Sequence, residues 1–335
     1  MPTDKRLLLM GGGDTLRAVV NYAVSLEMGR HEFGVLYDPE MEAEGGTFEA
    51  SAVADLCKQA DIACLSNADH DSREVAAWIG EQGFNLAIIC SWRRIISGVF
   101  LGLFEGNVIN IHNGDLPRHR GAGGLTWQVL QGERDAAIAV HVMSPTLDTG
   151  PVLFIKKQRL PEGPVYPATV MKTCHQLMVD EAIPQLFQAL EKPGTLAVQS
   201  QDSESACYFP MLFTPRNGLL DLSWEASATV TFIRAFSYPY PGATVRYGDQ
   251  VVRIKEASVR TRDADVHPYL QGLIANVCDA GIDVFVGGGV VRFELLVDDS
   301  GRPLPVDHFR AGNRFYNRAA DLLDARLYRH RHTRS

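Results

Sequence analysis

The feature that most restricts the fold is a regular alternation of short apolar runs with helical patterns in the first third of the chain. Short apolar runs of the length of buried strands lie at 6–10, 33–37, 62–65, 86–91 and 108–111. Apolar residues with helical spacing lie between them at 15–28, 50–60, 71–82 and 97–104. Strands that alternate with helices form a mostly parallel sheet with helices on both faces. The chain is therefore predicted to begin with an α/β, Rossmann-like domain.

Two further strands and a helix are expected to complete this domain. Residues 137–143 and 152–158 are predicted as strands joined through 144–150, and 170–190 has the apolar spacing of a helix. Pro184 lacks a backbone N–H and should kink that helix. We place the first domain at 1–191.

A second domain is expected because 335 residues are too many for one ordinary core. Residues 192–206 are polar and lack periodicity, which is typical of a linker. In the remaining stretch, 207–335, short β segments alternate with Gly-rich turns. This pattern predicts a smaller C-terminal β-barrel, OB-like in plan.

The composition limits the partners. A formal net charge of −8 opposes general nucleic-acid binding, which depends on Lys and Arg neutralising phosphates. The sequence has no run of the roughly 20 apolar residues that a membrane span needs, and its first apolar run is too short for a signal peptide. The six cysteines include no CxxC pair, so neither a zinc site nor a disulfide framework is predicted. We expect a cytoplasmic protein that binds no membrane.

Chemistry-bearing residues gather around one predicted strand end. Asn110 and His112 are two residues apart on the strand at 108–111 and its end, so their side chains point to the same face. Asp148 and Gly150 follow in a later loop, far enough along for the chain to return to that strand end. An amide, an imidazole and a carboxylate do not by themselves identify an active site, because a His at a strand end is commonly a structural hydrogen-bonding group.

The order of several motifs gives more information. Asn110-Ile-His112, Leu116-Pro117, Arg120-Gly121 and Leu147-Asp-Thr-Gly150 follow one another in the first domain. In the second domain the motifs are Thr214-Pro-Arg-Asn-Gly218, Leu222-Ser-Trp224, Ile233-Arg-Ala-Phe236 and Tyr240-Pro-Gly242. Their order and spacing resemble those of the folate-dependent formyltransferases, a family that includes glycinamide ribonucleotide, methionyl-tRNA and amino-sugar formyltransferases. The resemblance covers nearly the whole chain.

The resemblance implies transfer of a formyl group from N10-formyltetrahydrofolate, a co-substrate, to an amine, without a metal. Attack of an amine on a formyl carbon creates an oxyanion, which preorganised hydrogen-bond donors stabilise. Asn110 and a protonated His112 would donate to it. Asp148 would orient His112 and accept the proton of the amine as a general base.

The same resemblance places the pterin of the donor between the end of one strand and a loop. The candidate donor-binding residues are Ile89, Cys90, Trp92, His141, Met143 and Leu147. For Trp92 we favour packing over stacking on the pterin. Gly11-Gly12-Gly13 lacks the GxGxxG spacing, so a tight strand-to-helix turn is favoured over a nucleotide-binding loop.

The acceptor is less constrained. The sequence departs from the family pattern at Asn113-Gly-Asp115, where Pro-Ser-Leu is common, and Asp115 adds a carboxylate for a basic group. The candidate acceptor-binding residues are Arg93, Asn113, Asp115, Arg118, Arg120 and Gly121, and Arg94 and Arg216 are further cations for a pyrophosphate.

A small amine is favoured over tRNA as the acceptor. The stretch 38–46 is short and acidic, whereas methionyl-tRNA formyltransferases carry a basic insertion in this region. We predict an amino-sugar nucleotide. Methionyl-tRNA, another small amine of secondary metabolism, hydrolysis of the formyl donor and a non-catalytic folate-binding module stay open, as does homodimerisation.

Overall fold

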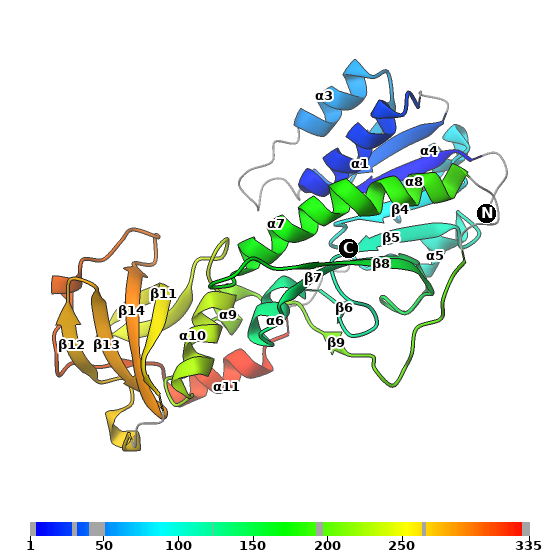
Figure 1. Cartoon of the computed structure of the whole chain (residues 1–335). Helices are drawn as coiled ribbons and strands as arrows, with labels where there is room; N and C mark the ends of the chain where they lie inside the picture. The colour runs from blue at the N-terminus through cyan, green and yellow to red at the C-terminus, as the bar shows by residue number, and fades with distance from the viewer. Residues whose placement is uncertain are drawn as a thin grey trace.

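The computed structural model describes residues 5–28, 32–39, 51–122, 124–191, 197–262 and 266–329. It has an α/β part, with helices packed on a central sheet, and a second part dominated by a curled antiparallel sheet (Figure 1). The prediction of a Rossmann-like fold with a smaller β domain is confirmed. None of the helices in the described ranges is long and apolar enough to cross a membrane.

The central sheet has seven strands in the order β3-β2-β1-β4-β5-β7-β8. β1 to β5 are parallel, and β7 and β8 are antiparallel to their neighbours. The strands are β1 (Leu7–Gly11), β2 (Phe33–Tyr37), β3 (Ala63–Ser66), β4 (Leu86–Cys90), β5 (Val108–His112), β7 (Asp135–Val142) and β8 (Val152–Arg159). The chain order reverses between β1 and β4, and ligand sites in such sheets lie beyond the strand ends near this point.

Alternate residues of the central strands pack into two separate layers of core, as the period of two requires. Leu7 and Leu9 of β1 belong to one layer, together with buried residues of α1, α3, α7 and α8. Leu8 and Met10 belong to the other, together with buried residues of α4 and α5. These helices are α1 (Gly13–Ser25), α3 (Ser51–Gln59), α4 (Arg73–Gln82), α5 (Gly98–Gly102), α7 (Pro167–Leu177) and α8 (Ile183–Glu191).

The helix predicted over 170–190 is interrupted earlier than expected. α7 and α8 are separated by a π-helical turn at Met178–Ala182, directly before Ile183 and Pro184. Pro184 has no N–H for the carbonyl four residues before it, and the widened turn accommodates that loss. The interruption is therefore a π turn ahead of the proline.

The opening Gly11-Gly12-Gly13 forms a tight turn from β1 into α1, as predicted. A Cβ on Gly11 would lie 2.0 Å from the Cys90 carbonyl oxygen, so glycine is required where β1 and β4 end side by side. The acidic stretch at 38–46 lies mostly outside the described residues, and within it Asp38 is buried.

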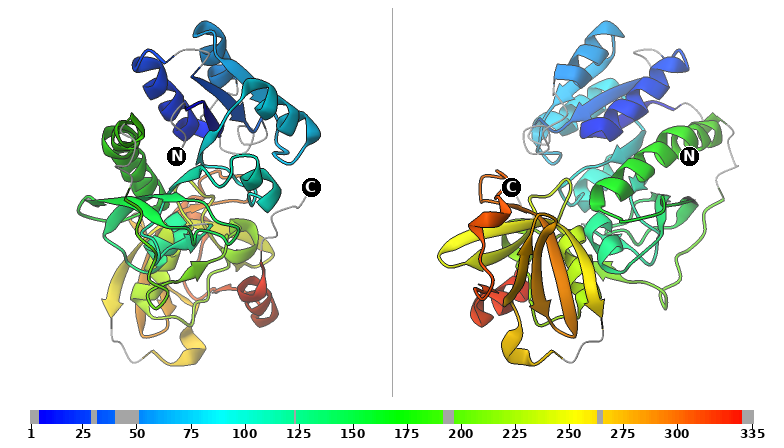
Figure 2. Two further views of the ribbon diagram at one scale, coloured as in Figure 1. Left: turned by 90° about the vertical axis from the view of Figure 1, so that its right-hand side faces the viewer. Right: turned by 60° about the vertical axis from the view of Figure 1, so that its left-hand side comes forward.

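The second part contains a six-stranded antiparallel sheet in the order β12-β13-β14-β11-β10-β15, which curls strongly (Figure 2). Its edges are joined where Ile274 N–H donates to the Asn313 carbonyl at 2.8 Å and Phe315 N–H donates to that of Gly272 at 2.9 Å. The expected barrel is thus a curled sheet whose edges meet over a short stretch. Its strands are β10 (Ala243–Tyr247), β11 (Gln250–Arg262), β12 (Ile274–Cys278), β13 (Gly281–Val286), β14 (Gly289–Val297) and β15 (Phe315–Tyr316).

The two parts share one continuous core. α10 packs against α6, and one cluster of buried residues runs from Val140 in β7 to Phe293 in β14. The other helices of the described ranges are α6 (Gly124–Leu130), α9 (Thr214–Asn217), α10 (Ala226–Ala235), α11 (Ala319–Leu327) and the 3-10 turns Pro268–Leu270 and Val306–His308. The division at 192–206 stays a prediction; residues 192–196 lie outside the described ranges, and 197–206 follows the surface of the first part.

Candidate active site

The predicted catalytic residues meet at the C-terminal end of β5. Asn110 and His112 lie near that end, on one face of the strand because they are two residues apart. The antiparallel neighbour β7 places His141 opposite Asn110. The loop between β7 and β8 brings Asp148 beside His112. The structure therefore brings Asn110, His112 and Asp148 together at the end of β5. Their catalytic roles stay predictions.

His141 fixes the orientation of the Asn110 amide. His141 Nδ1 lies 3.0 Å from the Val142 carbonyl oxygen, so Nδ1 carries a proton and donates it. Burial, and secondly the positive charge of a protonated His112, lowers the pKa of His141 to about 4, so its Nε2 is a free acceptor at neutral pH. Asn110 Nδ2 lies 3.1 Å from Nε2 and must donate to it. One N–H of the amide is left for a ligand.

One of the two ring nitrogens of His112 is engaged in a hydrogen bond to the backbone. Nε2 donates to the His119 carbonyl oxygen at 2.7 Å, which keeps a proton on Nε2. Nδ1 lies 3.8 Å from Asp148 Oδ2, farther than a direct hydrogen bond. Nδ1 is thus the ring nitrogen that faces the carboxylate.

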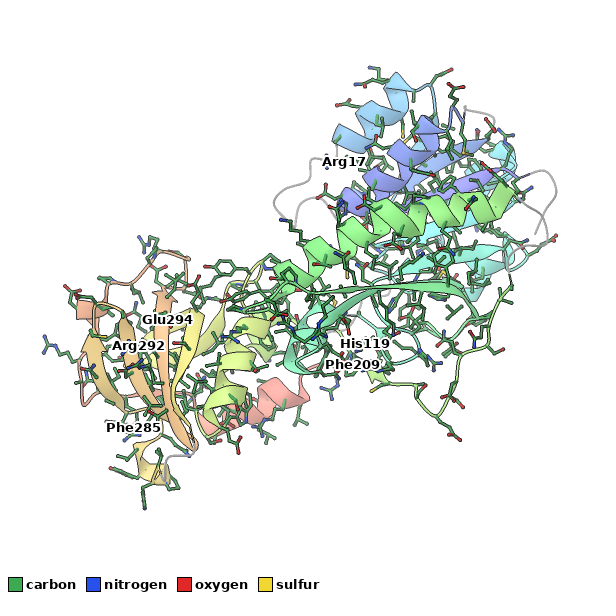
Figure 3. All side chains as sticks on the ribbon, viewed as in Figure 1. Arg17, His119, Phe209, Phe285, Arg292 and Glu294 are labelled. Carbon is green, nitrogen blue, oxygen red and sulfur yellow. The ribbon has the colours of Figure 1, made fainter. Side chains whose placement is uncertain are left out.

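The carbonyl that holds His112 belongs to a packed turn. His119 is buried, and its ring centroid lies 5.8 Å from that of Phe209, next to it in Figure 3. Burial lowers the pKa of His119, so its Nδ1 accepts the Asp115 N–H at 3.4 Å. This packing restrains the His112 ring indirectly.

Asp148 is buried, with 7% of its surface exposed, and its carboxylate is held by a backbone N–H. Its Oδ2 accepts the Gly121 N–H at 2.8 Å, and its Oδ1 lies 3.7 Å from His141 Nε2. The Asp148 backbone is left-handed, with φ of 53°, a conformation that Asp tolerates better than most residues. The turn thus directs this carboxylate at the two histidines.

Gly150 explains the glycine of the Leu147-Asp-Thr-Gly150 motif. A Cβ at this position would lie 1.8 Å from the Val142 carbonyl oxygen. Only glycine allows the loop to pack so closely on the end of β7. The motif therefore combines a carboxylate with the close approach that places it.

A pocket of about 380 Å³ opens onto these groups. This volume is in the range of small-molecule sites. Its apolar side chains include Ile89, Trp92, Ile96, Met143 and Leu147, and its polar ones include Asn110, His112, Asn113 and Asp148. Among the described residues there is no group of three or more His, Cys, Asp and Glu side chains that could hold a metal ion.

Trp92 both packs and lines this pocket. Its Nε1 donates to His70 Nδ1 at 3.3 Å, and the two rings meet edge to face at 5.9 Å. His70 in turn packs on Phe100 of α5, and burial lowers the pKa of His70, so Nδ1 is available as an acceptor. The indole is therefore held in place from behind while it borders the pocket.

Two predicted donor-binding residues lie behind the pocket wall. Cys90 is fully buried against Gly11, and His141 has 1% of its surface exposed. Neither borders the pocket, whereas Ile89, Trp92, Met143 and Leu147 do. His141 acts on the site through Asn110.

Of the predicted acceptor-binding residues, some border the pocket and others lie outside it. Arg93, Asn113 and Gly121 border the pocket. Asp115 lies outside it and accepts from Lys157 Nζ at 2.7 Å, while Arg118 pairs with Glu133 at 2.6 Å. Arg120 also lies outside the pocket lining.

Arg120 instead binds Gln201, and sequence reasoning missed this pair. Arg120 Nε and Nη2 lie 2.9 and 2.8 Å from Gln201 Oε1. Met211 and Tyr240, from the second part of the chain, also border the pocket and were not predicted as site residues. The Tyr240-Pro-Gly242 motif had drawn attention to Tyr240 only as a family feature, and nothing local in the sequence indicated Gln201.

Both parts of the chain match family models. Residues 5–176 match the family described as formyl transferase, and residues 213–314 match that described as formyl transferase, C-terminal domain. Together they include every residue of the pocket except Met211.

Relatives and solved structures agree with these matches. A methionyl-tRNA formyltransferase of Geobacter metallireducens is 29% identical over 290 residues, covering 86% of this chain and 90% of the relative. An N-formyltransferase from Helicobacter canadensis, solved with folinic acid and dTDP-3-aminofucose, superposes with a TM-score of 0.63 at 11% identity, covering 87% of this chain and 99% of that chain. WlaRD, a sugar 3N-formyl transferase solved with dTDP and 5-N-formyl-THF, has a TM-score of 0.62 at 10% identity, covering 88% and 98%. At these identities the structural likeness is one of fold.

Proposed function

Since this chain belongs to the formyl transferase family, we propose that it moves the formyl group of N10-formyltetrahydrofolate to the primary amine of a small acceptor, an amino-sugar nucleotide. The observation that carries the proposal is the meeting of Asn110, His112 and Asp148 at one pocket with an apolar side.

The pocket has the character that a folate donor needs. Ile89, Trp92 and Met143 offer flat or apolar surface for a pteridine ring, and the donor, when bound, supplies an activated formyl carbon. Asn110 and His112 border the same space, so a formyl group on N10, the nitrogen of the linker next to that ring, would lie beside them.

Asn110 and His112 are suited to stabilise charge on the formyl oxygen. Negative charge develops there as the amine attacks, and loss of one preorganised donor typically costs on the order of 10²–10³ in rate. Asn110 Nδ2 has one N–H engaged by His141 at 3.1 Å and a second N–H free for the oxygen. Protonated His112 offers Nδ1–H, because Nε2–H is already bound to the His119 carbonyl.

Asp148 is suited to accept the proton that the attacking amine must lose. It could return this proton to N10 as the bond between the formyl carbon and N10 breaks and tetrahydrofolate leaves. Its Oδ2 lies 3.8 Å from His112 Nδ1, so the carboxylate and the imidazole face the same side of the pocket. The Gly121 N–H at 2.8 Å holds the carboxylate while it acts. General-base catalysis of this kind contributes roughly 10²–10⁴ in rate.

Three observations favour a small phosphorylated acceptor over a tRNA. Arg93 and Arg94 border the pocket, and guanidinium groups match the geometry of phosphate oxygens. The pocket volume of about 380 Å³ suits a small molecule. The acidic stretch at 38–46 should repel a tRNA backbone in sequence terms.

Methionyl-tRNA is the second candidate acceptor, because a curated relative at 29% identity over 86% of this chain is a methionyl-tRNA formyltransferase. Another small amine of secondary metabolism would use the same catalytic groups. Hydrolysis of the donor and folate binding without catalysis are the remaining alternatives.

A test of the acceptor measures tetrahydrofolate release from N10-formyltetrahydrofolate with a panel of amino-sugar nucleotides, with methionyl-tRNA and with no amine. We expect release that depends on a sugar nucleotide. Arg93→Gln should raise the KM for that acceptor, whereas the matched Arg118→Gln, outside the pocket, should not. Release only with methionyl-tRNA would replace the proposed acceptor, and release without amine would indicate a hydrolase.

A further inference from the structure

The segment between the two parts of the chain has a role at the active site that its polar sequence does not suggest. The geometry points to Gln201 as a positioning residue, which holds the Asp148 turn and couples it to Arg120 of β6 (Arg120–Gly121). This inference rests on the proposed formyl transfer, because Asp148 is the proposed proton acceptor.

The side-chain amide of Gln201 uses its whole hydrogen-bonding capacity on this site. Its Nε2 donates to the carbonyl oxygens of Asp148 at 2.8 Å and of Gly150 at 2.7 Å. Its Oε1 accepts from Arg120 Nε at 2.9 Å and from Nη2 at 2.8 Å. A primary amide has two N–H donors and two acceptor lone pairs, and all four are engaged.

Gln201 thus joins two backbone segments that both position the Asp148 carboxylate. One side is the Asp148 turn itself, with its left-handed backbone. The other is β6, whose Gly121 N–H donates to Asp148 Oδ2 at 2.8 Å. Gln201 therefore closes a ring that runs from Asp148 through Gly121 and Arg120 and back to the Asp148 carbonyl.

The segment around Gln201 is itself anchored by backbone bonds. Gln199 pairs with Val152 at the start of β8, with both N–H···O distances 2.8 Å. Farther along, β9 (Tyr208–Phe209) pairs with β6, and Cys207 N–H donates to the Pro117 carbonyl at 3.1 Å. Gln201 lies between these two anchors, so its amide is presented to the turn from a fixed backbone.

Gln201 should therefore affect the orientation of Asp148 and not the binding of the donor. Gln201 and Arg120 do not border the pocket, so their removal should leave the donor's contacts in place. A displacement of about 1 Å in a catalytic group typically costs about 10² in rate. Turnover should therefore fall while donor binding persists.

Two substitutions of Gln201 distinguish the hydrogen bonds of its Nε2 from those of its Oε1. Gln201→Leu removes all four hydrogen bonds at similar volume. Gln201→Glu keeps an oxygen for Arg120 but places a second oxygen against the carbonyls of Asp148 and Gly150. Gln199→Leu is the matched control, since its side chain is exposed and its backbone bonds survive.

The first measurement is amide hydrogen exchange at Gly121. Its N–H donates to Asp148 Oδ2, so the exchange rate reports on that hydrogen bond and does not depend on catalytic activity. We expect exchange about tenfold faster or more in Gln201→Leu and Gln201→Glu, comparable to the loss of one hydrogen bond, and unchanged exchange in Gln199→Leu. Unchanged exchange in both Gln201 variants would overturn the inference even if formyl transfer were established.

The second measurement is kinetic. We expect kcat to fall about 10²-fold in both Gln201 variants, with the donor KM changed little and the melting temperature close to that of the wild type. In a cycle with Asp148→Asn, Gln201→Leu should add no further loss of kcat, because both changes remove the same group's action. Fully additive losses would show that Gln201 acts independently of Asp148 and would contradict the inference.

Discussion

Replacing Asp148 with asparagine separates charge from shape at the centre of the site. The Asn Oδ1 could still accept the Gly121 N–H that Asp148 Oδ2 accepts at 2.8 Å. Its Nδ2 would then lie toward His141 Nε2, where Asp148 Oδ1 is 3.7 Å away. Asparagine also tolerates the left-handed backbone at this position. The turn should therefore keep its conformation.

The expected magnitudes follow from what is lost. The Gly121 bond changes from charge-assisted to neutral, which costs about 1 kcal/mol of the free energy of unfolding. The proposed base is removed altogether, which should lower kcat by roughly 10²–10⁴. The donor dissociation constant should be nearly unchanged, since the pteridine contacts come from other side chains.

The assay is tetrahydrofolate release under saturating donor and acceptor, with urea unfolding and folate binding measured on the same preparations. Asp115→Asn is the control, because Asp115 is a buried carboxylate of the neighbouring loop that pairs with Lys157 and does not border the pocket. It should lose stability and keep its kcat. If Asp148→Asn kept kcat near the wild-type value, the assignment of Asp148 as proton acceptor would be refuted.

Three further predictions concern the groups around this carboxylate. Burial lowers the pKa of His141 from 6.5 to about 4, so between these pH values the unfolded chain binds a proton that the folded chain does not. The free energy of unfolding should consequently fall by up to about 3 kcal/mol as pH drops through that window, and urea titrations of His141→Gln should lack this part of the pH dependence. Gly150→Ala should destabilise the fold by about 1–3 kcal/mol through overpacking, because the new Cβ would lie 1.8 Å from the Val142 carbonyl oxygen, and its kcat should fall as well. Trp92→Ala should raise the donor KM roughly 3- to 10-fold through lost aromatic contact with kcat preserved, as measured by steady-state kinetics, whereas a fall in kcat alone would contradict a binding role.

The parts of the fold that were predictable are those encoded in local patterns. Alternate residues of β1 pack into opposite cores, so a short apolar run bounded by helices already indicated a parallel sheet. The spacing of Asn110 and His112 likewise fixed their common face, because strand geometry has a period of two. The length of the interrupted helix at α7 and α8 was predictable, but the π turn before Pro184 depends on packing that the pattern does not show.

The parts that were not predictable come from contacts between distant segments. Arg120 was expected to bind the acceptor, yet its guanidinium is turned to Gln201, a residue of the polar stretch assigned as linker. His141 was expected to line the donor site, yet it is buried behind Asn110. Tyr240 borders the pocket because α10 packs on α6 and brings the second part of the chain to the site. A single sequence carries no local signal for any of these pairings.

Transfer of a formyl group to an amine can be followed by isotope tracing. The protein is given N10-formyltetrahydrofolate with a ¹³C-labelled formyl carbon and an amino-sugar nucleotide, and the products are followed by NMR. We expect the label to appear as a formamide on the sugar amine at the rate of tetrahydrofolate release, and not to appear there with the Asp148→Asn variant. Label found only as free formate, at a rate independent of every amine supplied, would contradict this expectation.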